Sequence, residues 1–238
     1  MLFIRHATTA GMRAACFPGD GDADPASLSR AAALRPLLAA RVAQVSPGGA
    51  PRASPASAPL VSPSAAPQDA PDGPPRASLA AAPQDSSGGT PQISPAVAWV
   101  APAAAAWQTA VAMGREPRVC AALAEADCGR WRGLPYERVA REEPEALTRW
   151  LSDPHAAPHG GESRAALAHR VATWLDTERA ATRPTIAICD VGAIRAALGH
   201  ALGLDPTATA RFDVAPLSAT ELVAAPDGWR VAYVNRKV

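Results

Sequence analysis

The sequence predicts an α/β fold with a largely parallel sheet and helices on both faces. Short apolar segments at 1–4, 96–101 and 185–192 each precede a stretch with helical periodicity. Strands that alternate with helices favour parallel pairing, because each connecting helix crosses one face of the sheet. Outside a proline-rich segment at 46–95, the chain is long enough for a single domain that spans 1–238.

Three strands and two helices are expected in the first half of the chain. Leucines at helical spacing predict a helix over 24–44, and Pro36 is expected to kink it. A second helix is predicted over 102–113, with Pro102 at its first position. The expected strands are 1–4, 96–101 and 116–123.

The second half is expected to continue the alternation and to close with a hairpin. Helical periodicity covers 134–153, in two pieces divided near Pro144, and then 163–181. A strand over 185–192 leads into a helix over 193–204. Two final strands are predicted to meet at a turn around Asp227-Gly228.

The segment at 46–95 differs in composition from the rest of the chain. It holds 12 of the 25 prolines and five charged residues, and the strings AAPQD and PRAS each occur twice in it. Proline at this density excludes helix interiors and sheet ladders. We therefore predict a disordered, partly polyproline-II insertion. A neutral expansion of a surface loop is favoured over a docking segment for a weakly bound partner.

The overall composition excludes several classes of partner. The 23 basic and 22 acidic residues give a formal net charge of +1 without a basic block, so neither nucleic acid nor a membrane surface is expected. There is no signal-peptide pattern and no apolar run of 18 residues. Cys16, Cys120, Cys128 and Cys189 form no CxxC pair, which is typical of reduced thiols in a cytoplasmic protein. A small charged metabolite is the expected partner.

Residues suited to chemistry follow two of the predicted strands. Arg5-His6 ends the first strand, and Cys189-Asp190 ends the strand that begins at 185. Ligands of parallel sheets bind beyond the carboxyl ends of the strands. A guanidinium offers a fork of donors to phosphate oxygens, and a neutral imidazole is a nucleophile toward phosphorus. The pair indicates phosphoryl chemistry, and a strand that simply ends in polar residues is the alternative.

Four later segments agree with phosphoryl chemistry. They are a strand that turns into a helix at a proline (100–110), a loop in which Glu125 precedes Gly129 (123–133), the glycine turn HGGES (159–163) and a strand, turn and helix (188–203). With these segments the sequence resembles the histidine phosphatase superfamily, also called the phosphoglycerate-mutase-like family. The resemblance covers essentially the whole chain outside 46–95.

This resemblance implies a three-layer α/β/α sandwich and a phosphorylated histidine. In such proteins the first histidine is the nucleophile, two arginines and a second histidine hold the phosphoryl oxygens, and a glutamate protonates the leaving group. It implies His6 as the nucleophile, Glu125 as the proton donor and Arg5 as a phosphate ligand. Further positions also match the family pattern: Pro102, Thr109, Ala110, Gly129, Trp131, Gly133, Gly160, Gly161, Glu162, Ser163, Gly192 and Arg195.

Two positions depart from the pattern in a way that bears on mechanism. Ala105 stands where the second arginine is usual, and Asp190 stands where the second histidine is usual. A carboxylate about 4 Å from a phosphoryl oxygen repels it by roughly 4 kcal/mol per unit charge at an effective dielectric constant of 20. The loss of one preorganised donor costs about 10²–10³ in rate. Weakened catalysis is therefore expected.

Two compensations are open at this point. Glu125 could raise the pKa of Asp190, so that Asp190 is protonated and donates a hydrogen bond as the missing histidine would. Alternatively, a nearby arginine could replace the missing cation, and the candidates are Arg13, Arg130 and Arg132.

Phosphomonoester hydrolysis through a phospho-His6 intermediate is the predicted function, with no cofactor or metal. His6, Glu125 and Asp190 are the expected catalytic residues. The expected substrate-binding residues are Arg5, Arg13, Glu162 and Ser163. Two alternatives remain: an inactive or repurposed member that binds a metabolite or a protein in the same crevice, and a metal site made of His6, Glu125 and Asp190. The metal site ranks last, because the cationic Arg5 would repel a metal ion.

Overall fold

The computed structural model describes residues 1–44, 96–181 and 183–237, without the side chains of 41–44. The insertion predicted at 46–95 lies outside the described residues. In the described part, no helix combines the length and the apolar character that a membrane span requires.

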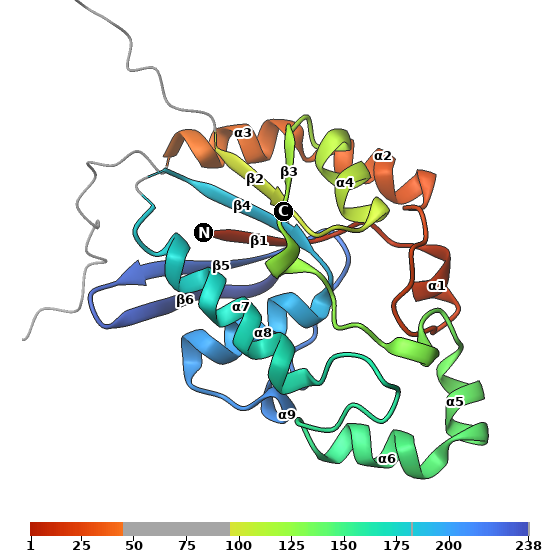
Figure 1. The fold of residues 1–238 in the computed structure, drawn as a ribbon. Coiled ribbons are helices and arrows are strands. Elements are labelled where there is room, and N and C mark those ends of the chain that lie inside the picture. The colour runs from red at the N-terminus through yellow and green to blue at the C-terminus, as the bar shows by residue number, and fades with distance from the viewer. Residues whose placement is uncertain (45–95, 182, 238) are drawn as a thin grey trace, which may run out of the picture. The chain divides into compact units, whose positions relative to one another are not determined.

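A six-stranded sheet forms the centre of the described fold (Figure 1). Its strand order is β3-β2-β4-β1-β5-β6. The first four strands in this order run parallel, and the last two pair antiparallel. The strands are β1 (Leu2–Arg5), β2 (Val97–Val100), β3 (Pro117–Val119), β4 (Thr185–Cys189), β5 (Ser218–Ala225) and β6 (Gly228–Lys237). This arrangement confirms the predicted α/β fold with a mostly parallel sheet.

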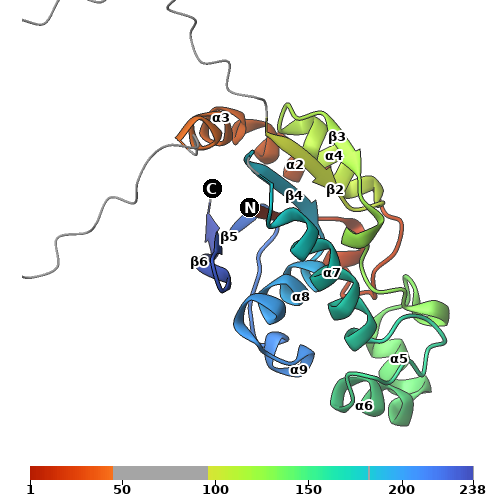
Figure 2. The same ribbon diagram turned by 60° about the vertical axis from the view of Figure 1, so that its left-hand side comes forward.

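Helices connect the parallel strands and cover the sheet (Figures 1 and 2). They are α1 (Ala10–Arg13), α2 (Pro25–Ala33), α3 (Arg35–Gln44), α4 (Ala104–Ala112), α5 (Tyr136–Glu142), α6 (Pro144–Ser152), α7 (Arg164–Glu178), α8 (Val191–Leu202) and α9 (Pro206–Thr209). Helix α4 packs on β2, β3 and β4 beside α2, whereas α7 packs against α8. Because parallel crossovers are right-handed, the two helix pairs cover opposite faces of the sheet.

Most predicted elements are confirmed, with shifts at their ends, but the strand expected over 116–123 covers only Pro117–Val119, and Ala121–Leu123 forms a 3-10 helix instead. The helix expected over 24–44 is interrupted at Leu34 and continues as α3, whose second residue is Pro36. Pro102 precedes α4 instead of beginning it, because Ala103 is the residue that caps this helix. Helix α8 begins at Val191, two residues before the expected start, because the side chain of Asp190 caps it. The sequence does not predict the short helices α1 and α9, since four residues give no periodicity to detect.

Of the three apolar clusters in the described part of the chain, two contain the most buried residues. The larger one joins the sheet to α7 and α8 and includes Phe3, Ile188 and Leu175, all fully buried. Phe3 meets Trp174 of α7 edge to face at a centroid distance of 6.3 Å. A smaller cluster around Phe17 and Trp131 lies under the loop that carries Glu125. Both clusters fix the ends of the strands and loops that meet at the carboxyl edge of the sheet.

Burial at α7 gives a direct test of this packing. Leu175 is 0% exposed, whereas Leu151 at the end of α6 is 54% exposed. Leu175→Ala should lower the free energy of unfolding by about 2–5 kcal/mol, because it leaves a cavity in the larger cluster. Leu151→Ala serves as the matched control and should change it by no more than about 0.5 kcal/mol. Urea unfolding followed by circular dichroism measures both; equal losses would contradict the assigned packing.

Candidate active site

The site begins with the parallel pairing of β1 and β4. Arg5 pairs with Cys189 in the register of these strands, and the His6 backbone N–H donates to the Cys189 carbonyl at 3.0 Å. The residues that follow the two strands, His6 and Asp190, therefore lie side by side at the carboxyl edge of the sheet. This is the edge at which parallel sheets bind ligands.

The imidazole of His6 is held between two acceptors. Its Nδ1 lies 2.8 Å from the carbonyl oxygen of Ala7, and its Nε2 lies 3.5 Å from Oδ2 of Asp190. The residue is 4% exposed. Burial alone would lower the pKa of His6, but the hydrogen bond and the negative charge of Asp190 outweigh burial and raise it. The surroundings of His6 therefore favour the imidazolium form.

A threonine fixes the backbone behind His6. The Ala7 N–H donates to the Thr109 hydroxyl at 2.9 Å, and this hydroxyl donates to the Ala105 carbonyl at 2.6 Å. The second bond is the common link from a helical threonine to a carbonyl one turn earlier. Thr109 thereby joins α4 to Ala7, the residue whose carbonyl contacts the His6 ring.

Asp190 carries its negative charge between two cationic side chains. Its Oδ1 accepts from the Val191 N–H at 2.6 Å, which caps α8, and lies 3.5 Å from Nε of Arg5. Burial alone would raise the pKa of Asp190, but the hydrogen bond from His6 and the charges of His6 and Arg5 lower it to about 2. The compensation in which Asp190 is protonated therefore does not fit this site. The cations beside it hold it ionised.

Of the two carboxyl groups, Glu125 is the one whose pKa is raised. Its carboxyl oxygens accept from the Ala126 N–H at 2.9 Å and from the Gly192 N–H at 2.7 Å. Burial first, and then the negative charge of Asp190, raise the pKa of Glu125 to about 7. A β-carbon at Gly192 would overlap the carboxyl group, so this close approach requires glycine. At neutral pH a large share of Glu125 is a proton donor.

Arg5 contributes the second cation of the site. Its Nη1 donates to the Val214 carbonyl at 2.7 Å. Its buried Nε makes no hydrogen bond and has only the longer ion pair with Asp190. The positive charge of Arg5 thus lies beside Asp190 at the edge of the site.

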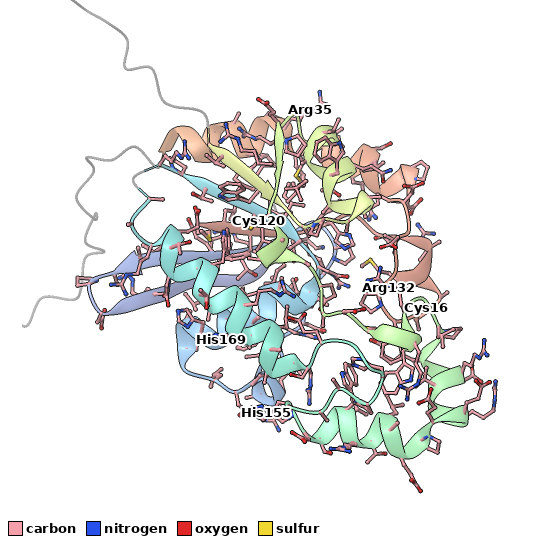
Figure 3. The ribbon with its side chains drawn as sticks, viewed as in Figure 1. Cys16, Arg35, Cys120, Arg132, His155 and His169 are labelled. Atoms are coloured by element: carbon pink, nitrogen blue, oxygen red, sulfur yellow. The ribbon has the colours of Figure 1, made fainter. Side chains whose placement is uncertain are left out.

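A cavity of about 520 Å³ brings these groups together. Its walls include Arg5, His6, Glu125 and Asp190, together with the small side chains of Ala101, which follows β2, and Ala105 of α4. The outer wall is the segment from Cys16 to Gly21 with Arg132, Gly133 and Tyr136. Figure 3 labels Cys16 and Arg132 close to α1. The volume suits a small metabolite.

The match to a known family agrees with this geometry. The pattern described as "Histidine phosphatase superfamily (branch 1)" matches residues 89–237, which is more than half of the chain. The chain belongs to the histidine phosphatase superfamily. Two residues that carry the resemblance in the sequence, His6 and Glu125, both line the cavity.

A known phosphatase matches part of the chain by sequence, and solved structures of phosphatases share its fold. Glucosyl-3-phosphoglycerate phosphatase of Mycobacterium tuberculosis is 39% identical over 69 residues, which are 27% of this chain and 31% of that protein. The chain therefore aligns with less than a third of that relative's length. A structure of the mycobacterial glucosyl-3-phosphoglycerate phosphatase with VO3 has a TM-score of 0.69 at 21% identity, covering 100% of this chain and 98% of that one.

A more distant structure shows the same fold. The putative alpha-ribazole-5'-P phosphatase of Escherichia coli has a TM-score of 0.69 at 14% identity, covering 100% of this chain and 97% of that one. At these identities the likeness concerns the fold alone. It confirms the phosphoglycerate-mutase-like architecture that the sequence motifs indicate.

Three of the predicted substrate-binding residues lie outside the cavity. The guanidinium of Arg13 pairs with Asp24 on the surface. Glu162 pairs with Arg170 at 2.6 Å. The Ser163 hydroxyl accepts from the Ala166 N–H at 3.1 Å and caps α7. None of the three lines the cavity, so Arg5 alone of that group contacts the site.

The candidates for a replacement cation separate in the same way. Arg130 pairs with Glu143 away from the cavity, whereas Arg132 lines its outer wall. Arg132 already lies 3.1 Å from Asp20 and 3.5 Å from Asp127. Among the residues that the structure describes, no three or more His, Cys, Asp and Glu side chains are grouped so that they could hold a metal ion.

Gly192 provides a test of how Glu125 is held. Gly192→Ala should push the carboxyl group away from the N-terminus of α8 toward solvent, so its pKa should fall from about 7 toward the ordinary value near 4.5. A ¹³C NMR titration of labelled glutamates measures this change, and Glu125→Gln identifies the resonance. Gly11→Ala is the control, since a β-carbon there meets only ordinary contacts. An unchanged pKa in Gly192→Ala would contradict the assigned contact.

Proposed function

We propose that this histidine phosphatase hydrolyses small phosphomonoesters through a phospho-His6 intermediate, at a reduced rate. The observation that carries the proposal is the pairing, on one cavity, of a positioned imidazole with a carboxyl group of pKa about 7. Nδ1 of His6 is fixed on the Ala7 carbonyl, so the reactive nitrogen is Nε2, on the Asp190 side. The phosphatase names of its relatives agree with this chemistry.

Two proton transfers complete the proposed reaction. The lone pair of neutral His6 Nε2 forms a bond to phosphorus while the ester P–O bond breaks, and the leaving oxygen takes the proton of Glu125. Water then attacks the phosphorus of phospho-His6 and gives a proton to the Glu125 carboxylate. The P–N bond breaks, which releases inorganic phosphate and restores both residues. Arg5 would stabilise the charge on the transferred phosphoryl group.

The protonation states of the pocket explain why the rate should be low. The reaction needs His6 without its second proton and Glu125 with its proton. Asp190 works against the first requirement, because it raises the pKa of His6. It also repels the incoming phosphoryl group, by roughly 4 kcal/mol per unit charge at 4 Å and a dielectric constant of 20. Ala105 supplies no donor in return.

A second candidate function is a pocket that binds but does not turn over its ligand. The observation that favours it is the Asp190 carboxylate, which lies 3.5 Å from both Arg5 Nε and His6 Nε2. Asp190 thus occupies the two cationic groups that a phosphoryl group would need. A small phosphorylated metabolite in the cytoplasm is the partner that we propose in either case, without nucleic acid, membrane or cofactor.

The first experiment separates the two functions. Release of phosphate from 4-nitrophenyl phosphate is measured from pH 4 to 9 for the native protein and for His6→Ala. Turnover that disappears in His6→Ala is the expected result. If the native protein releases no phosphate, and the double variant Ala105→Arg, Asp190→His does, the pocket is a binding site that has lost hydrolysis.

Asp190→Asn tests the cause of the low rate. Loss of the charge should lower the pKa of His6, and a pKa lower by one raises the neutral fraction about tenfold in more acidic solution. The pKa of Glu125 should fall as well, because Asp190 raises it. The whole bell-shaped profile of kcat/KM should therefore move to lower pH, with a gain of about tenfold near pH 5–6.

A matched control exists on the far side of the fold. Asp176 pairs with His200 at 2.8 Å, outside the pocket with Glu125 and His6. Asp176→Asn removes an aspartate from a histidine in the same way and should leave the profile of kcat/KM unchanged. A profile that stays in place in Asp190→Asn would exclude Asp190 as the cause.

A further inference from the structure

We propose that Glu162 and Arg170 are positioning residues that hold the loop 121–127 so that the carboxyl group of Glu125 faces His6. Neither residue lines the cavity, so neither touches the substrate. The proposal rests on the proposed role of Glu125 as proton donor. It gives Glu162, which lies in the segment HGGES (159–163), a role other than substrate binding.

Arg170 donates hydrogen bonds to the part of the loop that precedes Glu125 in the sequence. Its Nη1 donates to the carbonyls of Ala121, Ala122 and Ala124 at 3.1, 2.8 and 3.2 Å, and its Nη2 donates to the Ala124 carbonyl at 3.2 Å. The Ala121 carbonyl also accepts from the Ala124 N–H at 3.1 Å at the end of the 3-10 helix Ala121–Leu123, so Arg170 adds a side-chain donor to a short turn. The planar guanidinium suits this task, because its donors are fixed relative to one another.

Glu162 contacts the part of the loop that follows Glu125 through its backbone, and its side chain holds Arg170 in place. Its carboxylate accepts from Arg170 Nε at 3.0 Å and from Nη2 at 2.6 Å, which is a two-point pair. Its own backbone N–H donates to the Asp127 carbonyl at 2.7 Å. The loop is therefore tied one residue before and two residues after Glu125.

The loop 121–127 also lies in close contact with the glycine turn that precedes Glu162. A β-carbon at Gly161 would overlap the Asp127 carbonyl, so the turn before Glu162 lies directly on the loop. Helix α7, which carries Arg170, is anchored in the larger apolar cluster through Val171 and Leu175. The loop thus takes its position from the rigid core.

General acid catalysis depends on the leaving group, which makes the proposal testable. A poor leaving group such as an alkoxide needs the proton of Glu125, and general acids contribute about 10²–10⁴ in rate. The 4-nitrophenolate ion leaves without a proton. Displacement of Glu125 should therefore slow an alkyl phosphate far more than 4-nitrophenyl phosphate.

The experiment compares Arg170→Met with Arg164→Met on both esters. Arg170→Met should lower kcat/KM about 10²-fold or more for 2-phenylethyl phosphate and less than about fivefold for 4-nitrophenyl phosphate. Glu125→Gln should show the same selectivity, and the double variant should lose little more. Arg164 lies on the same helix and donates to the Leu151 carbonyl at 2.9 Å, so Arg164→Met should affect both esters equally and weakly. Equal losses on both esters in Arg170→Met would overturn the proposal.

A second readout separates this proposal from the proposed function. The pKa of Glu125, measured by ¹³C NMR, should fall toward its ordinary value in Arg170→Met and stay raised in Arg164→Met, because the released loop exposes the carboxyl group. In Glu162→Gln, which keeps the size of the side chain, the pKa of Glu125 should lie between its values in Arg170→Met and Arg164→Met. If the native protein hydrolyses neither ester, the proposed function fails while the NMR result still decides the positioning claim. An unchanged Glu125 pKa in Arg170→Met overturns it.

Discussion

The parallel pairing of β1 with β4 is the constraint on which the site depends. In-register hydrogen bonds place Arg5 opposite Cys189, so His6 and Asp190 emerge next to each other at one edge of the sheet. The helix that starts at Val191 then directs its first N–H groups toward the same space. Helix N-termini favour negative charge, and both Asp190 and Glu125 accept hydrogen bonds there. Two carboxyl groups and one imidazole are thus fixed by backbone geometry.

The charges of Asp190 and His6 affect each other's pKa, and both affect the pKa of Glu125. Asp190 has the nearest cations, so it stays ionised and its partner His6 holds a proton. Glu125 has no cation within ion-pair distance among the described residues, so burial and the charge of Asp190 leave it protonated. The proposed general acid thus has a pKa near neutral pH, while Asp190 favours the protonated form of the proposed nucleophile. In the proposed reaction, Asp190 therefore opposes the activation of His6 and supports the protonated form of Glu125.

Much of the fold and of the site follows from the sequence, and the failures have a common cause. Strands, caps and the motif positions His6 and Glu125 are local signals, so the sequence carries them. The sequence does not show which partner a long polar side chain reaches: Arg13 reaches Asp24, and Glu162 reaches Arg170 eight residues along. The sequence leaves the protonation of Asp190 open for the same reason, since it depends on cations placed 3.5 Å away by the sheet.

The fold and the chemistry place different demands on the two substituted positions. Asp190 is a favourable residue for the N-cap of α8, where its side chain satisfies the Val191 N–H. Ala105 is 2% exposed and packs with Ala7 and Ala23 against Leu28 and Leu217, so an apolar side chain fits there. Both residues therefore suit the folded state, whatever their effect on phosphate binding. In the function that we propose, stability does not oppose a weaker site, because the two residues that would weaken it also fit the architecture.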